Sequence, residues 1–415
     1  MTAQEVFDVA IIGGGPAGAT AAEALATEGH RVLLLERGNR IKPCGGAVPP
    51  RLVDEFNIPR SQLVAHIKQA RVVAPSKRHV DMPIDQGYIG MVDRVVFDQW
   101  LRQRAANRGA DLRLGEFLRL NDNESGTVHI EYREQGGSRH RIREVEAQVV
   151  IGADGANSMV ASQGLYKKAR LSMVSDRNEV LRFVPGENPM PHVAAYHEIV
   201  ATPAGGYNPG RCDIFYDSHL SPDFYGWVFP HGKTISVGVG SAQKGFSLRK
   251  AVTELRRENG LENTETLRRE GGSIPLHALQ RWDNGRNVIV VGDAAGVVAP
   301  ASGEGIYYAM LSGKLAAAAV NQRLLTGDPQ ALKLARKQFM HAHSQTFRML
   351  NLMQRYWYTR DDRRERFVSM CSDRDVQQLT WKAYLNKRLV KARPFAHARI
   401  LLKNLGHLTG LASTA

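Results

Sequence analysis

The stretch Asp8 to Gly18, DVAIIGGGPAG, decides the fold of this chain. Its apolar run, Val9 to Ile12, is typical of a strand buried on both faces of a parallel sheet. Gly13, Gly15 and Gly18 follow in the pattern G-x-G-x-x-G. Gly13 permits a tight turn, Gly15 leaves room for a pyrophosphate, and Gly18 lets a helix pack close to the sheet. The stretch therefore predicts the start of a dinucleotide-binding unit.

The residues that follow complete this unit. Pro16 to Thr27 is rich in Ala and Leu and predicts a helix, with Gly29 as its C-cap. The amides at its N-terminus favour phosphate binding. Arg31 to Glu36 predicts the second strand, and Glu36 lies where an acid accepts hydrogen bonds from a ribose diol. This context indicates a dinucleotide but leaves FAD and NAD(P) both open.

Length and composition fit a folded protein of two or three domains. The chain has 415 residues, of which 43% are hydrophobic and 23% charged. Its three cysteines are too far apart for a disulfide framework or a cysteine-based zinc site. The net charge of +14 suits an anionic ligand or an anionic membrane surface. We find no nucleic-acid-binding motif and no histidines at metal-ligand spacing, so we expect neither nucleic acid nor a metal.

The first half of the chain alternates strands with loops and one further helix. Residues 38–60 hold many Gly and Pro residues and predict an irregular loop. Strands are expected at 69–75 and 88–92, and Asp93 is expected to cap a helix that ends at Arg108. Residues 127–133 and 139–145 alternate apolar and polar side chains around Gly136-Gly137, which indicates a β-hairpin.

The second half returns to the pattern of the opening stretch. Residues 148–151 and 287–291 predict buried strands, each followed by a Gly/Asp patch, and 306–325 predicts a long helix. Between them, residues 160–275 indicate a mostly antiparallel domain. We expect an α/β fold: a Rossmann-like FAD-binding domain (1–160 with 280–330), an inserted antiparallel substrate domain (161–279, joined by 70–92), and a helical C-terminal region (331–415).

Three patches in this order resemble the FAD-dependent hydroxylase and reductase superfamily. They are Gly13–Gly18, Gly152–Gly155 and Gly292–Gly296, the last followed by Gly303-Glu304-Gly305. The resemblance implies tightly bound FAD with NADPH as a passing reductant. It assigns the pyrophosphate to the first patch, the ribose to Glu36, the ribityl region to Asp293 and the flavin pyrimidine to the helix start. The cofactor-binding residues it implies are Gly13, Gly15, Ala17, Gly18, Glu36, Arg37, Gly45, Gly46, Arg94, Asp154, Asp293, Gly305 and Ile306. From its position alone, Arg94 is equally explained as a helix-surface residue.

Other segments resemble one branch, the geranylgeranyl reductases. These are Lys42–Ala47 (KPCGGA), Pro222–Pro230 (PDFYGWVFP) and Ser302–Tyr307 (SGEGIY). Residues 364–389 are similar to the members of chlorophyll and bacteriochlorophyll synthesis. The resemblance implies a reductase that saturates three double bonds of a geranylgeranyl group to give phytyl. Its substrate would be geranylgeranyl-(bacterio)chlorophyll or geranylgeranyl diphosphate, and other pigment-synthesis proteins are candidate partners.

Two features would give such an enzyme its chemistry. Cys44 lies in a Gly/Pro-rich loop expected near the flavin, where it could donate a proton or position the substrate. Its alternative is a small buried apolar side chain. Tyr225, Trp227, Phe229 and Pro230 belong to a segment whose aromatics alternate, as a strand would present them to an apolar substrate. Their alternative is ordinary core packing.

The tail from Lys382 to Leu411 combines basic and apolar residues. It predicts either a surface that rests on anionic lipid or a helix packed on the body with a basic outer face. We find no signal peptide, no transit peptide and no membrane-spanning run, and expect a bacterial, cytoplasmic protein at the periphery of the photosynthetic membrane. The rival functions are a related FAD-dependent monooxygenase, a prenyl-lipid or quinone reductase, and a non-catalytic FAD-binding subunit.

Overall fold

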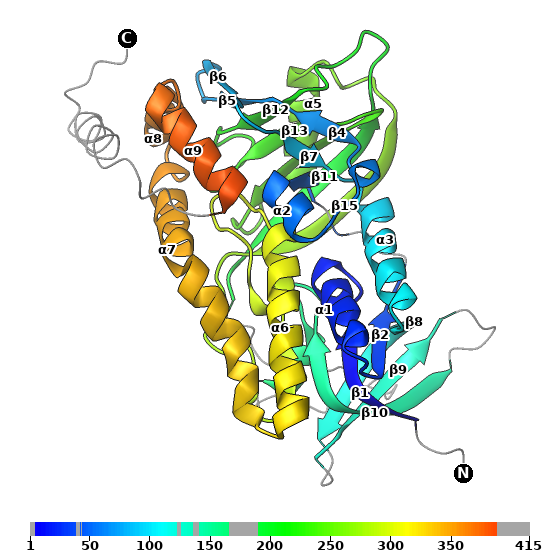
Figure 1. The fold of residues 1–415 in the computed structure, drawn as a ribbon. Coiled ribbons are helices and arrows are strands. Elements are labelled where there is room, and N and C mark those ends of the chain that lie inside the picture. The colour runs from blue at the N-terminus through cyan, green and yellow to red at the C-terminus, as the bar shows by residue number, and fades with distance from the viewer. Residues whose placement is uncertain are drawn as a thin grey trace, which may run out of the picture.

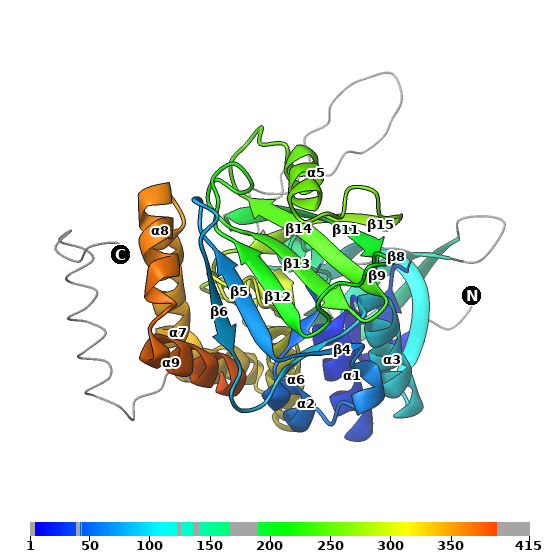
Figure 2. The same cartoon turned by 90° about the horizontal axis from the view of Figure 1, so that it is seen from above.

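The computed structural model describes residues 5–38, 42, 44–122, 126–135, 141–165 and 190–387. Two large β-sheets lie at opposite ends of this part of the molecule (Figure 1). Helices α1, α3 and α6 lie against the first sheet, and α8 and α9 lie beside the edge of the second (Figure 2). The expected α/β class is confirmed.

The first sheet has a parallel core with the strand order β8-β2-β1-β10-β16. Its strands β2 and β16 and the second halves of β1 and β10 are buried on both faces, as expected for a sheet covered on each side. The distal half of β8 and the first half of β10 pair antiparallel with β9, which adds a three-stranded layer to the core. The strands are β1 (Glu5–Ile12), β2 (Val32–Glu36), β8 (Asp111–Asp122), β9 (Val128–Glu134), β10 (Ile142–Gly152) and β16 (Val288–Val290).

Strand β10 corrects one expectation from the sequence. Residues 139–145 and 148–151 predict two strands, but Ile142–Gly152 is one continuous strand. Its first half pairs antiparallel with β9, as the hairpin pattern predicts, and Val145–Gly152 pairs parallel with β1. The same strand therefore shows an alternating burial pattern at its start and continuous burial at its end.

The second sheet has the order β15-β11-β14-β13-β12-β5-β6 and is antiparallel except for the β12–β5 pair. Its strands are β5 (Gln69–Val73), β6 (His79–Pro83), β11 (His192–Ala201), β12 (Arg211–Phe215), β13 (Gly226–His231), β14 (Thr234–Ser241) and β15 (Thr266–Pro275). A small sheet, β3-β7-β4, joins Ala47–Val48, Ile89–Met91 and Ala65–Ile67. Strands β5 and β6 belong to the same sheet as β11 to β15, which supports the proposal that residues 70–92 contribute to the substrate domain. The boundaries of the three domains remain a proposal.

The helices position the site through two long contacts. Helix α1 packs along α6, and the 25-residue α7 packs along the other side of α6 (Figure 1). The longer helices are α1 (Pro16–Thr27), α3 (Arg94–Asn107), α5 (Leu248–Glu258), α6 (Ile306–Thr326), α7 (Lys333–Trp357), α8 (Asp361–Met370) and α9 (Arg374–Asn386), and α4 (Met159–Gly164) is short. The predicted caps are present, because Asp93 accepts a hydrogen bond from Val95 N and Gly29 has a φ of 87°.

The Gly/Pro-rich segment 38–60 is more ordered than its composition suggests. It contains β3 and a six-residue helix, α2 (Pro50–Glu55). Pro50 occupies the first turn of α2, where its missing N–H costs nothing because the first amides of a helix have no partner within the helix. The prediction of an irregular loop is therefore wrong for its second half.

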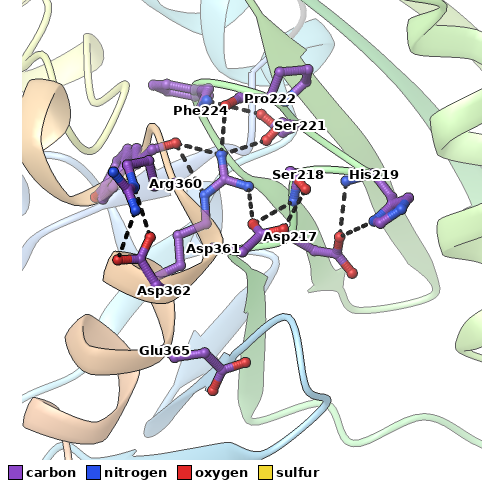
Figure 3. A network of polar contacts seen from close by, with 12 residues as sticks. Asp217, Ser218, His219, Ser221, Pro222, Phe224, Arg360, Asp361, Asp362 and Glu365 are labelled. Carbon is purple, nitrogen blue, oxygen red and sulfur yellow. Dashed lines mark hydrogen bonds and ion pairs between the residues drawn. The ribbon is translucent and has the colours of Figure 1, made fainter.

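Helix α8 is hydrogen-bonded to the segment that leads into β13. Arg364 is fully buried, and its guanidinium donates to the carbonyl oxygens of Ser221 at 2.8 Å and Pro222 at 2.7 Å. Asp361 accepts hydrogen bonds from the backbone and the side chain of Ser218 (Figure 3). The C-terminal helices thus hold a loop that lies about 140 residues earlier in the chain.

The described part of the basic tail packs on the body. Leu385 packs in an apolar cluster with Ile84 and Ile89, and Lys387 is buried against Glu304. Residues 382–387 therefore follow the packed alternative, while 388–411 lie outside the described residues. Within the described ranges, no helix is long and apolar enough to cross a membrane.

Candidate functional site

A cleft of about 350 Å³ runs from the parallel sheet to the face of the antiparallel sheet. This volume lies within the range of small-molecule and cofactor sites. Its walls combine the ends of β1, β2 and β10, the start of α6, one side of α3 and the aromatic residues of the 224–229 segment. The predicted residues that line it are Gly13, Gly15, Ala17, Glu36, Arg37, Cys44, Gly45, Arg94, Asp154, Tyr225, Trp227, Phe229, Asp293, Gly305 and Ile306.

The three glycines of the opening motif have three different environments. Gly13 has a φ of 105°, and a Cβ there would lie 2.4 Å from the Ala153 carbonyl oxygen. A Cβ on Gly18 would lie 1.9 Å from the Gly13 carbonyl oxygen. A Cβ on Gly15 would meet no atom within 4 Å, because Gly15 faces the cleft. Gly13 and Gly18 thus shape the turn, while Gly15 leaves space for a ligand.

Two helices begin at this cleft without a side-chain cap among the described residues. They are α1, whose N-cap is Gly15, and the 21-residue α6, whose N-cap is Gly305. Each helix start presents amide N–H groups and a partial positive charge to the cleft. Gly13–Gly18 and Gly303–Ile306 together are called the cofactor cradle below. Its open position at Gly15 and its paired helix starts fit a dinucleotide.

Glu36 ends β2 at the rim of the cradle, where the ribose-binding acid is expected. One carboxylate oxygen accepts from Gly14 N at 2.7 Å and the other from Gly38 N at 2.9 Å. These bonds hold the carboxylate beside the glycine turn. Arg37 follows it at the cleft wall with an exposed side chain.

The two late aspartates have different surroundings. Asp293 follows β16, lies in the cleft wall and pairs with Lys42. Asp154 accepts from Ser158 Oγ, Met159 N and Val160 N, so its side chain caps α4. Burial raises the pKa of Asp154, against the effect of these hydrogen bonds. The structure gives Asp154 a supporting role at the cleft wall that its sequence motif does not indicate.

Helix α3 contributes a row of three charged side chains, of which only Arg94 was predicted as a site residue from the sequence. Arg94, Asp98 and Arg102 are spaced four residues apart, and all three line the cleft. Arg94 donates to both Asp98 oxygens, at 2.7 and 2.6 Å. Arg102 donates to the Gly14 carbonyl oxygen at 3.3 Å. The i, i+4, i+8 spacing on a predicted helix was the available signal for Asp98 and Arg102.

Arg94 is 8% exposed and lies beside Cys44. Burial alone would lower the pKa of Arg94, but the Asp98 carboxylate, with a smaller contribution from Cys44, raises it overall. A fixed positive charge therefore lies next to the Cys44 thiol. This arrangement favours the functional reading of Arg94 over a helix-surface role.

The loop residues Cys44 to Gly46 lie between the cradle and the antiparallel sheet. Cys44 Sγ accepts from Gly46 N at 3.3 Å, and Cys44 is partly exposed to the cleft. A Cβ on Gly45 would lie 2.8 Å from the Phe229 ring, and one on Gly46 would lie 2.5 Å from the His231 ring. Gly46 and Gly18 are not among the residues that line the cleft; both permit close packing behind it.

Three aromatic residues form the wall opposite the cradle. Tyr225, Trp227 and Phe229 all line the cleft, as the alternating pattern predicts, and are called the aromatic wall below. Tyr225 donates its hydroxyl proton to the Ser302 carbonyl oxygen at 2.6 Å, which ties the wall to the cradle. Pro230 is buried but does not line the cleft, because strand alternation directs it to the opposite face.

A buried ion pair lies directly behind the start of α6. Glu304 and Lys387 are paired, with side-chain exposures of 7% and 2%. Burial raises the pKa of Glu304 and lowers that of Lys387, and in each case the partner's charge opposes the shift. The pair anchors the end of α9 to the cradle.

Comparison with known proteins places this geometry among flavoproteins. Residues 58–337 match the FAD binding domain family, and residues 11–66 match an NAD(P)-binding Rossmann-like domain. The chain is 49% identical over 407 residues to a geranylgeranyl diphosphate reductase from Rhodobacter capsulatus, covering 98% of both chains. It is 35% identical to one from Synechocystis, covering 97% of this chain and 98% of that one. A geranylgeranyl bacteriochlorophyll reductase-like protein from Thermoplasma acidophilum has the same fold, with a TM-score of 0.78 at 23% identity, covering 97% and 99% of the two chains.

Proposed function

Because this chain belongs to the geranylgeranyl diphosphate reductase family, we propose that it is a flavin-dependent reductase of (bacterio)chlorophyll synthesis. It saturates three double bonds of a geranylgeranyl group, carried on the pigment or as the diphosphate, to give phytyl. The observation that carries this proposal is the single cleft that joins a dinucleotide cradle to an aromatic wall, with Cys44 between them.

The cofactor cradle would hold FAD, whose reduced form supplies a hydride to one alkene carbon. Gly15 leaves space for the pyrophosphate, and the start of α1 stabilises its charge. Glu36 would bind the adenosine ribose, Asp293 the ribityl region, and the start of α6 the pyrimidine end, because all three line the cleft.

The aromatic wall binds and shields the prenyl chain. An isolated alkene has no carbonyl to polarise, so the site must hold the double bond in place and exclude water. Tyr225, Trp227 and Phe229 supply an apolar surface that faces the cradle. Their contact with the chain orients the double bond toward Cys44.

Cys44 donates its thiol proton to the second alkene carbon. The new C–H bond forms as the S–H bond breaks, and the thiolate left behind is stabilised by the adjacent Arg94 cation. Together with the hydride on the first carbon, this completes the two-electron reduction of one double bond. Asp98 accepts two hydrogen bonds from the Arg94 guanidinium and so positions it for this step.

NADPH is the proposed source of electrons for the flavin. The Rossmann-like match covers the first part of the cradle, which FAD would occupy. NADPH would therefore bind in passing at the open cleft. Because a geranylgeranyl pigment resides in a membrane, we also propose that the protein works at the membrane periphery and beside other pigment-synthesis proteins.

The test uses FAD-loaded protein that is kept reduced by excess dithionite without oxygen and mixed with geranylgeranyl-bacteriochlorophyll or geranylgeranyl diphosphate. Mass spectrometry should show products that have gained two hydrogens for each reduced double bond. The reaction should stop after three double bonds have been reduced. Recovery of both substrates unchanged would refute the proposal. NADPH oxidation with peroxide release in air would instead indicate the monooxygenase rival.

Cys44→Ala tests the proton donor. We expect unchanged FAD binding and flavin reduction, with alkene reduction slower by about 100-fold or more. Cys371→Ala is the matched control, because Cys371 is also a free cysteine but is buried and does not line the cleft. Normal turnover in Cys44→Ala would exclude the thiol as donor and leave the reductase proposal standing.

A further inference from the structure

A second, much smaller cavity lies on the far side of Cys44. Cys44 and Arg94 line both this cavity and the main cleft, so they form the partition between the two spaces. The small cavity measures about 20 Å³, which is room for about one water molecule. The other polar residues that line it are Asp93, His197, His231, Thr234, Arg268 and Glu270.

Two buried polar atoms in this wall lack a hydrogen-bond partner in the described part of the chain. They are Arg268 Nε, a donor, and Glu270 Oε1, an acceptor. The two atoms lie 3.3 Å apart as an ion-pair contact, but no hydrogen bond joins them. A donor and an acceptor left unsatisfied beside a water-sized polar cavity point to a bound water.

The other polar side chains near the cavity, Ser236 and His197, already have hydrogen-bond partners. Ser236 Oγ accepts from Trp227 Nε1 at 3.1 Å and lies 2.9 Å from His197 Nδ1. Ser236 can therefore give its one proton to Nδ1, which leaves the ring proton on Nε2, 2.7 Å from Glu270 Oε2. Glu270 is held by His197 through one oxygen, and its other oxygen is available to the cavity.

Two residues of the cavity wall, Arg268 and Asp93, also reach the solvent. Arg268 Nη2 lies 3.5 Å from the Asp93 carboxylate, and these two side chains are 32% and 31% exposed. In the main cleft, by contrast, a bound prenyl chain would cover Cys44 and exclude water. A proton that returns to Cys44 during turnover must then come through the partition.

We propose that this cavity holds one water molecule, bridged between Arg268 Nε and Glu270 Oε1, and that Cys44 regains its proton through it. The inference rests on the proposed function, in which Cys44 gives up one proton for each double bond. The Cys44 thiolate takes a proton from the water as one O–H bond breaks and the S–H bond forms. A proton from bulk solvent, entering beside Asp93 and Arg268, restores the water. Glu270 and Arg268 are positioning residues in this step, and no electrons move.

The first test is a high-resolution crystal structure of the FAD-loaded wild-type protein. We expect one ordered water within hydrogen-bond distance of Arg268 Nε and Glu270 Oε1 and next to Cys44 Sγ. A dry cavity would overturn the proposal. This readout does not depend on turnover, so it stands even if the protein proves not to reduce geranylgeranyl groups.

The second test compares the first reduction with the later ones. In Glu270→Gln, Cys44 starts with its proton, so the first double bond should be reduced at the wild-type rate in a single turnover. The second and third reductions should slow by about tenfold or more, and partly reduced chains should accumulate. Equal slowing of all three reductions, or none, would exclude the route.

Two further variants guard against a purely structural effect. Arg268→Met removes the other water ligand while keeping the His197–Glu270 hydrogen bond, and it should give the same pattern as Glu270→Gln. Glu198→Gln is the matched control, because Glu198 follows His197 on β11 and faces the other side of the sheet, where it pairs with Arg256. It should leave the ratio of first to later reductions unchanged.

Discussion

The cofactor cradle and the aromatic wall face each other across one cleft, yet they are built in different ways. The cradle consists mainly of backbone: glycine turns and two helix starts. The aromatic wall consists of side chains whose positions depend on distant segments, including Ser302 and the buried Arg364. Behind Trp227, Ser236 Oγ accepts a hydrogen bond from the indole N–H and lies within hydrogen-bond distance of His197.

This difference separates binding from chemistry. A cradle made of backbone recognises what every dinucleotide shares, namely phosphates and a ribose. The aromatic wall, Cys44 and their supports determine which substrate meets the cofactor. Mutations in the cradle should therefore affect folding and FAD binding. Mutations of the wall itself or of the Arg364 side chain that holds it should affect stability and substrate handling with FAD retained.

The largest effect is expected from Gly18→Ala. Alanine favours helices by about 1 kcal/mol, but its Cβ would lie 1.9 Å from a backbone oxygen that cannot move aside. We expect a net loss of about 4 kcal/mol in the free energy of unfolding, or failure to fold. Denaturant unfolding of the protein without FAD measures this.

Gly15→Ala is its matched counterpart. Gly15 has a φ of −72° and free space around it, so unfolding should change by less than about 0.5 kcal/mol. FAD affinity should nevertheless fall by about tenfold or more, as a fluorescence titration would show. Full FAD affinity in this variant would mean that the cradle does not hold the pyrophosphate at Gly15.

Arg364→Met tests the support of the aromatic wall. The change leaves the buried carbonyl oxygens of Ser221 and Tyr358 without their Arg364 donor, at about 1 to 3 kcal/mol each. This loss is partly offset because no charge has to be buried. We expect a net loss of about 3 kcal/mol, a higher KM for the prenyl substrate, and unchanged FAD affinity.

Arg360→Met is the control for that variant. Arg360 is 63% exposed and pairs with Asp362 on the same helix, as Figure 3 shows. Such surface pairs contribute about 1 kcal/mol or less. If both variants lost the same stability, the burial of Arg364 would not explain its effect.

His231 gives a smaller, pH-dependent effect at the junction of the two regions. Burial lowers the pKa of His231 from 6.5 to about 4, with His197 adding to the shift and the Phe229 carbonyl and Asp93 opposing it. Between these pH values the unfolded chain binds a proton that the folded chain does not, so stability falls as pH drops from 6.5 toward 4.

Because the His231 ring is partly exposed, we expect about 2 kcal/mol over this interval. The measurement is denaturant unfolding across the interval in the wild type and in His231→Gln. The variant should lack this part of the slope, and identical slopes would contradict the prediction. Above pH 6.5 His231 should contribute no slope.

The sequence by itself determined the cradle and most of the elements around it. The turn at Gly13, the close packing at Gly18 and the cap at Asp93 depend on backbone conformation within a few residues, which local residue types specify. The apolar runs of β1, β2 and β16 likewise predict burial without any knowledge of their neighbours. The aromatic alternation of Tyr225, Trp227 and Phe229 was readable for the same reason.

Only the tertiary structure decided the features that depend on contacts between segments distant in the sequence. Strand β10 is one strand because two different partners cover its two halves, and Asp154 turns to α4 because that helix starts beside it. The small cavity behind Cys44 exists because the loop that holds Cys44 meets α3 and strands β11, β13, β14 and β15 there. No local sequence pattern predicts such contacts, because the residues that stabilise each position there are distant in the sequence.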